Sequence, residues 1–154
     1  MGLLQNFSKP RGFFGRVISL LMNYGEHAKI GRWGMSFVEL PIQADILDLG
    51  CGGGGNLERW LERYPDAHVS GIDHSPVSVS IASGWNEKAI SEDRCEVILS
   101  GVQKLPFRDA SFDAISSFES IYFWSNMEKA LAEAYRVLKP GGVILLVVAR
   151  DKEN

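Results

Sequence analysis

The spacing of apolar positions changes along the chain, and the change predicts where helices and strands lie. In residues 13–40 most apolar side chains recur at helical spacing, which predicts one amphipathic helix from Phe13 to Leu21 and a second from about Glu26 to Leu40. The apolar stripe of the second helix consists of Ile30, Trp33, Phe37 and Leu40. These helices are expected either to close one side of the core or to act as a lid over a ligand, after an irregular arm at residues 1–12.

After Pro41 the pattern becomes an alternation of strands and helices. The predicted strands are residues 45–49, 68–73, 96–100, 111–117 and 143–149. The predicted helices are residues 57–64, which end before Pro65, residues 76–90, which Ser75 caps, and residues 126–138, which end in a reversing loop at 139–142. Strands separated by helices pair in parallel through right-handed crossovers. The chain is therefore expected to be an α/β protein with a doubly wound, mainly parallel sheet of about five strands.

Composition and charge narrow the class of ligand. A chain of 154 residues with net charge −3 is long enough for one core, and its scattered basic residues do not suggest a nucleic-acid partner. A small-molecule ligand is the better expectation. Two cysteines without paired spacing indicate neither zinc nor a disulfide framework, and no leader or membrane-spanning run is evident, so a cytoplasmic protein is expected.

One stretch, Ile46–Asn56, indicates a ligand loop. A buried apolar strand stops at five glycines within six residues, and Asp48 lies just before the turn. Glycine costs conformational entropy, so such a cluster indicates a sharp turn or the close approach of a ligand. Cys51, inside the loop, is a conceivable nucleophile at a helix start, but no base adjoins it in the sequence.

Two classes of cofactor are compatible with this loop. Gly50, Gly52 and Gly55 satisfy G-x-G-x-x-G, and Asp73 lies 18 residues beyond Gly55, as in dinucleotide-binding proteins. An anionic pyrophosphate would, however, be repelled by Asp48, whereas an ammonium group would be attracted. S-adenosylmethionine carries such an ammonium group and a ribose, so it is favoured over a nicotinamide dinucleotide, which remains an alternative.

Five short motifs together resemble a known family. They are Asp48-Leu-Gly-Cys-Gly-Gly-Gly54, Gly71-Ile-Asp73, Leu105-Pro-Phe107, Ser111-Phe-Asp113 and Arg136-Val-Leu-Lys-Pro-Gly-Gly142. Their order and spacing are similar to those of the class I S-adenosylmethionine-dependent methyltransferases, whose domain is Rossmann-like. The resemblance covers residues 45–150 and implies S-adenosyl-L-methionine as cofactor.

The resemblance also implies roles for individual residues. Asp48 and the backbone of Gly50, Cys51 and Gly52 would hold the methionine portion, and Asp73 would bind both ribose hydroxyls. Further cofactor contacts are expected from His74, Gly101, Val102 and Phe118. Many relatives carry an aspartate where this chain has Gly101, so adenine recognition would pass to backbone near Val102 or to Ser100.

The methyl acceptor is expected at the end of the fourth strand, in Phe118–Trp124. There Glu119 is a candidate general base or a partner for a substrate amine, and Tyr122 and Trp124 would form an apolar wall; alternatively, the aromatic residues only pack the end of the sheet. His27, on the predicted lid, is a further weak candidate. No metal site is expected.

The resembled fold usually has seven strands, whereas this sequence stops after the fifth. We therefore expect a two-part chain, with an arm and lid-like helices at 1–40 and a C-terminally incomplete cofactor domain at 41–154. Residues 143–149 would form an open sheet edge, where another copy of the chain could bind. The leading hypothesis is a methyltransferase acting on a small molecule; the alternative is a non-catalytic domain that binds the cofactor or a protein partner.

Overall fold

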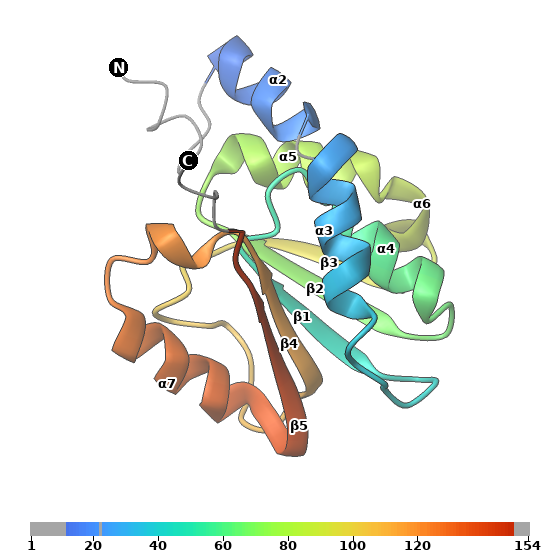
Figure 1. Ribbon diagram of the computed structural model, residues 1–154, viewed down its shortest axis with the longest axis vertical. Helices are drawn as coiled ribbons and strands as arrows, with labels where there is room; N and C mark the ends of the chain where they lie inside the picture. The colour runs from blue at the N-terminus through green and yellow to red at the C-terminus, as the bar shows by residue number, and fades with distance from the viewer. Residues whose placement is uncertain (1–11, 22, 150–154) are drawn as a thin grey trace, which may run out of the picture.

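A five-stranded parallel sheet forms the middle layer of the protein, with helices on both faces (Figure 1). The computed structural model describes residues 12–21 and 23–149. Its helices are α2 (Gly12–Leu21), α3 (Gly25–Met35), α4 (Gly55–Arg63), α5 (Pro76–Trp85), α6 (Glu87–Ser91) and α7 (Met127–Val137), with a short 3-10 helix η1 (Ile121–Phe123). Its strands are β1 (Asp45–Leu49), β2 (His68–Asp73), β3 (Cys95–Leu99), β4 (Phe112–Phe118) and β5 (Leu138–Val147).

The strands lie in the order β3-β2-β1-β4-β5. The chain therefore adds β2 and β3 on one side of β1 and then β4 and β5 on the other, so the strand order reverses between β1 and β4. In doubly wound sheets, ligands bind outside the carboxyl ends of the strands at such a reversal. The two faces of the sheet carry separate core clusters. Trp60 of α4 belongs to the cluster under α3, α4, α5 and α6, whereas Ala134 of α7 belongs to the other. The predicted doubly wound, parallel sheet is thereby confirmed.

Several elements lie where local sequence signals placed them. β1 and β2 have the predicted bounds, and α4 buries Leu57, Trp60 and Leu61 as its periodicity indicated. The Ser75 side chain accepts a hydrogen bond from the backbone N–H of Ser78 at 3.3 Å, which confirms the predicted cap. The predicted arm at residues 1–12 lies mostly outside the described residues, because only Gly12 is described and it begins α2.

The predicted single helix up to Ile90 is wrong, because the chain forms two helices that meet at Asn86. The Asn86 side chain donates to the carbonyl of Ala82 and to the carbonyl of Gly54, both at 3.0 Å. An asparagine that bonds backbone groups in this way competes with helix continuation. The break therefore serves a contact with the glycine loop, which the local sequence did not reveal.

The expected loop at residues 139–142 is instead the first part of β5. Phe112 of β4 pairs with Leu138, and the register then shifts before Ala114 pairs with Val143. A Cβ on Gly142 would lie 2.9 Å from the carbonyl oxygen of Asp113, so only glycine permits this approach of the two strands. The proline in this stretch is tolerated because β5 is an edge strand.

α3 is shorter than predicted and packs through a different face. It ends at Met35, where the Ser36 side chain donates to the carbonyl of Trp33. Trp33 is 61% exposed and Phe37 69% exposed, so half of the predicted apolar stripe is not buried, whereas Ile30 and Leu40 pack partly buried against the core. The buried face carries small residues instead: Ala28, Gly31 and Gly34. A Cβ on Gly34 would lie 2.5 Å from Val147, which explains why this face approaches the sheet so closely.

Candidate functional site

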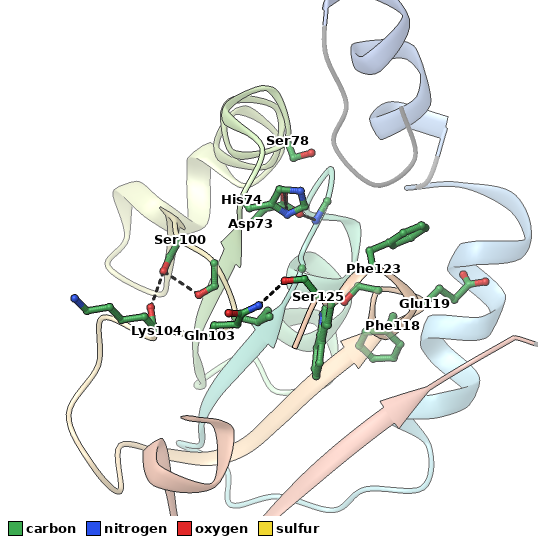
Figure 2. Close-up of a pocket in the computed structure, with 16 residues that line it drawn as sticks. Asp73, His74, Ser78, Ser100, Gln103, Lys104, Phe118, Glu119, Phe123 and Ser125 are labelled. Carbon is green, nitrogen blue, oxygen red and sulfur yellow. Dashed lines mark hydrogen bonds and ion pairs between the residues drawn. The ribbon is translucent and has the colours of Figure 1, made fainter. Parts of the chain in front are cut away.

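A cavity of about 460 Å³ opens at the carboxyl ends of β1, β2 and β4. Figure 2 shows Asp73 and His74 on one side of it, and Phe118, Phe123 and Glu119 on the other. Its remaining lining residues are Gly50, Gly52, Ser78, Ser100, Gly101, Val102, Gln103, Lys104, Ser120, Trp124 and Ser125. This volume is within the range of small-molecule and cofactor sites.

Asp73, the last residue of β2, faces the cavity while it holds two backbone groups. Its Oδ2 accepts from the N–H of Gly52 at 3.0 Å, and its Oδ1 accepts from the N–H of Ser75 at 2.8 Å. Burial raises the pKa of Asp73 above its ordinary value, although these two donors act in the opposite direction. A carboxylate has about four lone-pair positions, so both oxygens retain acceptor capacity toward a ligand.

The glycine loop turns sharply because its backbone enters the left-handed region. Gly50 has φ +72° and Gly54 has φ +83°. The backbone N–H groups of Gly50 and Cys51 both donate to the carbonyl of Ile72 at 2.9 Å. A Cβ on Gly50 would lie 2.5 Å from Ser120 Oγ, so glycine is required here by both conformation and space.

Two buried asparagines, which the sequence analysis did not identify, hold the glycine loop. Asn23 accepts from the N–H of Gly55 at 3.0 Å and donates to the carbonyl of Gly53 at 2.9 Å. Asn86 donates to the carbonyl of Gly54 at 3.0 Å. The first N–H of α4 is thus satisfied by a side chain 32 residues away, because its own N-cap, Gly54, has no side chain to do so.

Asp48 lies beneath the glycine loop and does not line the cavity. It is 2% exposed, and its Oδ1 accepts from Ser116 Oγ at 2.6 Å. Trp60 Nε1 in turn donates to Ser116 Oγ at 3.0 Å. Burial raises the pKa of Asp48 to about 7, which the hydrogen bond from Ser116 partly opposes and the charge of Asp73 reinforces. Its contact with the methionine portion stays a prediction.

Cys51 also lies away from the large cavity. It is 7% exposed and lines a smaller hollow of about 30 Å³ in place of the large cavity. Burial, followed by the charges of Asp73 and Asp48, raises the pKa of the Cys51 thiol well above its ordinary value. A thiol held protonated in this way is a poor nucleophile. This agrees with a role for Cys51 as a small residue of the turn.

Gly101 and Val102 lie on the wall of the cavity next to β3. A Cβ on Gly101 would have no atom within 4 Å, so the missing side chain leaves open space. The loop that follows is fixed to α7 by Arg136, which donates to the carbonyls of Leu105 at 3.1 Å and Phe107 at 2.8 Å. The motifs at 105–107 and 136–142 therefore meet to shape this wall.

The aromatic wall of the cavity consists of other residues than expected. Phe118, Phe123 and Trp124 line the cavity, whereas Tyr122 does not. The Tyr122 hydroxyl donates to the carbonyl of Ala149 at 2.6 Å, and its side chain is 55% exposed. Tyr122 thus fastens the segment after β4 to the chain beyond β5, and the structure does not bring it to the candidate site.

The structure joins two candidates that the sequence analysis treated separately. His27 Nδ1 of α3 lies 2.5 Å from Oε2 of Glu119, which follows β4. Glu119 adopts φ +54°, a conformation that costs energy in a non-glycine residue. It lines both the large cavity and the smaller hollow, whereas His27 lines only the hollow. The pair therefore lies where the two spaces meet.

Other motif residues have structural roles and do not line the cavity. At the amino end of the sheet, Asp113 accepts from the N–H of Asp45 at 2.8 Å and from Lys139 at 3.0 Å. A Cβ on Gly71 would lie 2.8 Å from Leu57 and 3.0 Å from Cys51, so this glycine permits close helix packing. These motif positions fix the relative placement of strands and helices.

Neither a membrane-spanning helix nor a metal-binding cluster is found among the residues that the structure describes. None of its helices is long and apolar enough to cross a membrane. Within the same residues, no group of three or more His, Cys, Asp or Glu side chains is arranged to hold a metal ion.

The part of the chain that contains these motifs is similar to known proteins. A family model described as "Methyltransferase domain" matches residues 47–146. The 24-methylenesterol C-methyltransferase 2 of Arabidopsis thaliana is 40% identical over 109 residues, which are 71% of this chain and 30% of that protein. The rice (Oryza sativa subsp. japonica) protein of the same name is 38% identical over 98 residues, 64% of this chain and 27% of that protein. The chain thus spans less than a third of the length of these curated relatives.

A solved structure shares the fold over most of the chain. It is a SAM-dependent methyltransferase from Aquifex aeolicus, with a TM-score of 0.76 and 22% identity over 90% of this chain and 77% of that one. At this identity the likeness concerns the fold alone. It extends the match beyond the family model, to nearly the whole described chain.

Proposed function

The chain belongs to the methyltransferase domain family, within the class I S-adenosyl-L-methionine-dependent methyltransferases, and we propose that it transfers the methyl group of S-adenosyl-L-methionine to a small, largely apolar acceptor. The observation that carries this proposal is the cavity between Asp73 and the aromatic wall of Phe118, Phe123 and Trp124. One side is polar and suits a ribose, and the other is apolar and suits the body of an acceptor.

The residues present fit the cofactor. Asp73 has unused lone pairs for two ribose hydroxyls, since each of its oxygens accepts one backbone N–H. His74 and Val102 also line the cavity, and the space beside Gly101 is open to an adenine ring. Adenine recognition through backbone near Val102 or through Ser100 follows from the lack of a side chain at Gly101.

When bound, S-adenosyl-L-methionine supplies a methyl group already activated on a sulfonium. The share of the protein is therefore to align the partners and to exclude water. Asp73 orients the adenosine end, the glycine loop fixes the approach of the methionine portion, and Phe118, 8% exposed, shields the reacting region from solvent. Asp48 lies beneath the glycine loop, where it accepts from Ser116 Oγ, and its contact with the methionine portion stays a prediction from the sequence.

The acceptor is proposed to be a small molecule with an apolar body. Phe123 and Trp124 line the cavity, with Phe123 on the far side from Asp73 (Figure 2), and Phe123 is 44% exposed, so it is reachable from solvent. The names of the relatives from Arabidopsis and rice, both 24-methylenesterol C-methyltransferases, support an apolar acceptor. A nucleic acid is disfavoured by the net charge of −3.

Two measurements test the proposal. Calorimetry with S-adenosyl-L-methionine and S-adenosyl-L-homocysteine is expected to give binding to the wild type and roughly 10- to 100-fold weaker binding to Asp73→Asn, because the hydrogen bonds from ribose hydroxyls to a charged acceptor are weakened. Asp73→Asn is preferable to Asp73→Ala, since the amide oxygen still accepts one backbone N–H. Asp113→Asn, which alters a hydrogen-bonded carboxylate at the other end of the sheet, is the matched control.

Turnover is measured by formation of S-adenosyl-L-homocysteine with a panel of sterols, phenols, apolar alcohols and amines. A methylated product confirmed by mass spectrometry supports the proposal. Cofactor binding without turnover of any panel member favours the alternative, a non-catalytic cofactor-binding or interaction domain. Binding of NAD in place of S-adenosyl-L-methionine would overturn both.

A further inference from the structure

The smaller hollow contains a single acidic side chain among the described residues that line it. Its residues are Asn23, His27, Gly50–Gly53, Gly55, Asn56, Phe118 and Glu119. It shares Gly50, Gly52, Phe118 and Glu119 with the large cavity, so the two spaces adjoin. Its volume of about 30 Å³ suits one small polar group, such as a water molecule or an ammonium group.

Glu119 is held so that one carboxylate oxygen stays available. His27 Nδ1 occupies Oε2 at 2.5 Å, and among the side chains and backbone that the structure describes the other oxygen, Oε1, has no hydrogen-bond or ion-pair partner. Figure 2 shows the Glu119 side chain at the border of the cavity, directed away from Asp73. The backbone of Glu119 is fixed as well, because its N–H donates to the carbonyl of Val147 at 2.8 Å.

Backbone strain supports a functional reason for this placement. Glu119 adopts φ +54°, which glycine would adopt without strain. A strained residue persists only when the surrounding structure fixes it, and such residues gather at ligand sites. Here the strain places a carboxylate next to the glycine loop, where the sequence alone had assigned that role to Asp48.

Asp48 is less suited to bind a cation from the ligand. It lines neither the cavity nor the hollow, and its Oδ1 already accepts from Ser116. Its pKa of about 7, which burial causes, also leaves much of it uncharged near neutral pH. Glu119, in contrast, borders both spaces.

We propose that the smaller hollow receives the α-ammonium group of the cofactor's amino-acid tail, that Glu119 is the carboxylate that binds it, and that His27 is the residue that positions Glu119. This inference rests on the proposed function, because it concerns the same cofactor. Because His27 belongs to α3, this N-terminal helix would contribute to cofactor recognition in addition to covering the sheet.

The test compares two ligands that differ in the tail. S-adenosyl-L-homocysteine carries the ammonium group, and 5′-methylthioadenosine lacks the whole amino-acid tail. Calorimetry is expected to show that Glu119→Gln weakens binding of the first roughly 10- to 100-fold, because a charged hydrogen bond is lost, and leaves binding of the second unchanged. His27→Gln is expected to give a smaller loss, again for S-adenosyl-L-homocysteine only, which a general loss of stability would not produce.

Two further variants keep the test decisive. Glu119→Gly removes the carboxylate and relieves the positive φ, which offsets the lost contact with His27, and it should show the same tail-specific loss. Asp93→Asn is the matched control, since Asp93 is an exposed acid with φ +55° far from the cavity. The measured quantity is the ratio of the affinity for S-adenosyl-L-homocysteine to that for 5′-methylthioadenosine. The inference is overturned if Glu119→Gln leaves this ratio unchanged, or if only Asp48→Asn lowers it. A wild type that binds neither ligand overturns the proposed function itself.

Discussion

Asn23 and Asn86 hold adjacent carbonyl groups of the glycine loop. The amide of Asn23 donates to Gly53 at 2.9 Å, and the amide of Asn86 donates to Gly54 at 3.0 Å. One residue precedes α3, and the other separates α5 from α6. The shape of the glycine loop therefore depends on two side chains that lie outside it. Buried amides of this kind are costly to leave unsatisfied, so the contacts favour a single loop conformation.

Replacing either asparagine is expected to weaken both the fold and the binding of the cofactor. Asn23→Ala and Asn86→Ala each leave a buried loop carbonyl without its donor, which costs about 1–3 kcal/mol in the free energy of unfolding. Because the loop is then free to change shape, the Kd for S-adenosyl-L-homocysteine should rise in the folded protein. Urea unfolding and calorimetry measure the two effects.

Asn126→Ala is the control for this pair of variants. The Asn126 side chain caps α7 by accepting from the N–H of Lys129 at 2.9 Å, away from the loop. Its loss should lower the free energy of unfolding by about 1 kcal/mol and leave the Kd unchanged. If all three variants change the Kd equally, the asparagines at the loop have no special role in binding.

Asp48 is expected to make stability depend on pH. Its pKa rises from an ordinary value of 3.8 to about 7 in the folded protein, so the folded state binds the proton more tightly than the unfolded state. The stabilisation is complete below about pH 4 and is lost as the pH rises through about 7. Asp48→Asn removes this dependence, so relative to wild type it should gain roughly 1–4 kcal/mol between pH 4 and pH 8.

Urea unfolding of both proteins at intervals across that pH range checks the sign. Asp73, whose pKa burial also raises, is present in both proteins, so the difference between the two curves reports Asp48 together with its electrostatic coupling to Asp73. Curves that stay parallel from pH 4 to pH 8 would show that Asp48 is ionised in the folded protein as readily as in the unfolded chain.

A side chain at Gly101 is expected to block the cofactor without harming the fold. A Cβ there meets no atom within 4 Å, and the residue lines the cavity. Gly101→Leu should therefore keep its melting temperature and lose most of its affinity for S-adenosyl-L-homocysteine. Gly84→Leu is the matched control, since Gly84 of α5 also has open space around its Cβ but does not line the cavity. Equal affinities of the two variants would place adenine elsewhere.

Self-association through β5 is a separate expectation. Within the described residues, β5 pairs only with β4, and Val143, Leu146 and Val148 are 37%, 38% and 52% exposed along it or just beyond it. An exposed edge with apolar side chains favours pairing with a second copy of the chain. Light scattering at micromolar concentration should show a dimer, and Val148→Lys should give monomers. Leu99→Lys, on the opposite edge strand, should not; a monomeric wild type contradicts the expectation.

Local signals in the sequence were sufficient for much of the sheet. The apolar run before the glycines marks β1, and Ser75 followed by Pro76 marks the start of α5, because each signal acts within a few neighbouring residues. The order of the motifs also indicated the family, and Asp73, which belongs to one of them, stands at the end of β2 and lines the cavity.

The surroundings of each candidate residue could not be inferred in this way. The periodicity of α3 indicated Trp33 as buried, yet its small residues face the sheet and Trp33 is 61% exposed. Asn86 breaks a helix because of a carbonyl in the glycine loop, 32 residues earlier. Neither contact leaves a mark on the neighbouring sequence, since the partner belongs to another element.

The sequence by itself determined the order of strands and helices, the glycine loop after β1 and the cofactor class, because these depend on residues that are neighbours in the chain. Only the tertiary structure decided that Asp48 is buried under the loop, that Tyr122 lies outside the cavity and that His27 meets Glu119 across 92 positions. Burial and pairing are properties of packed surfaces, which arise only when the sheet brings distant segments together.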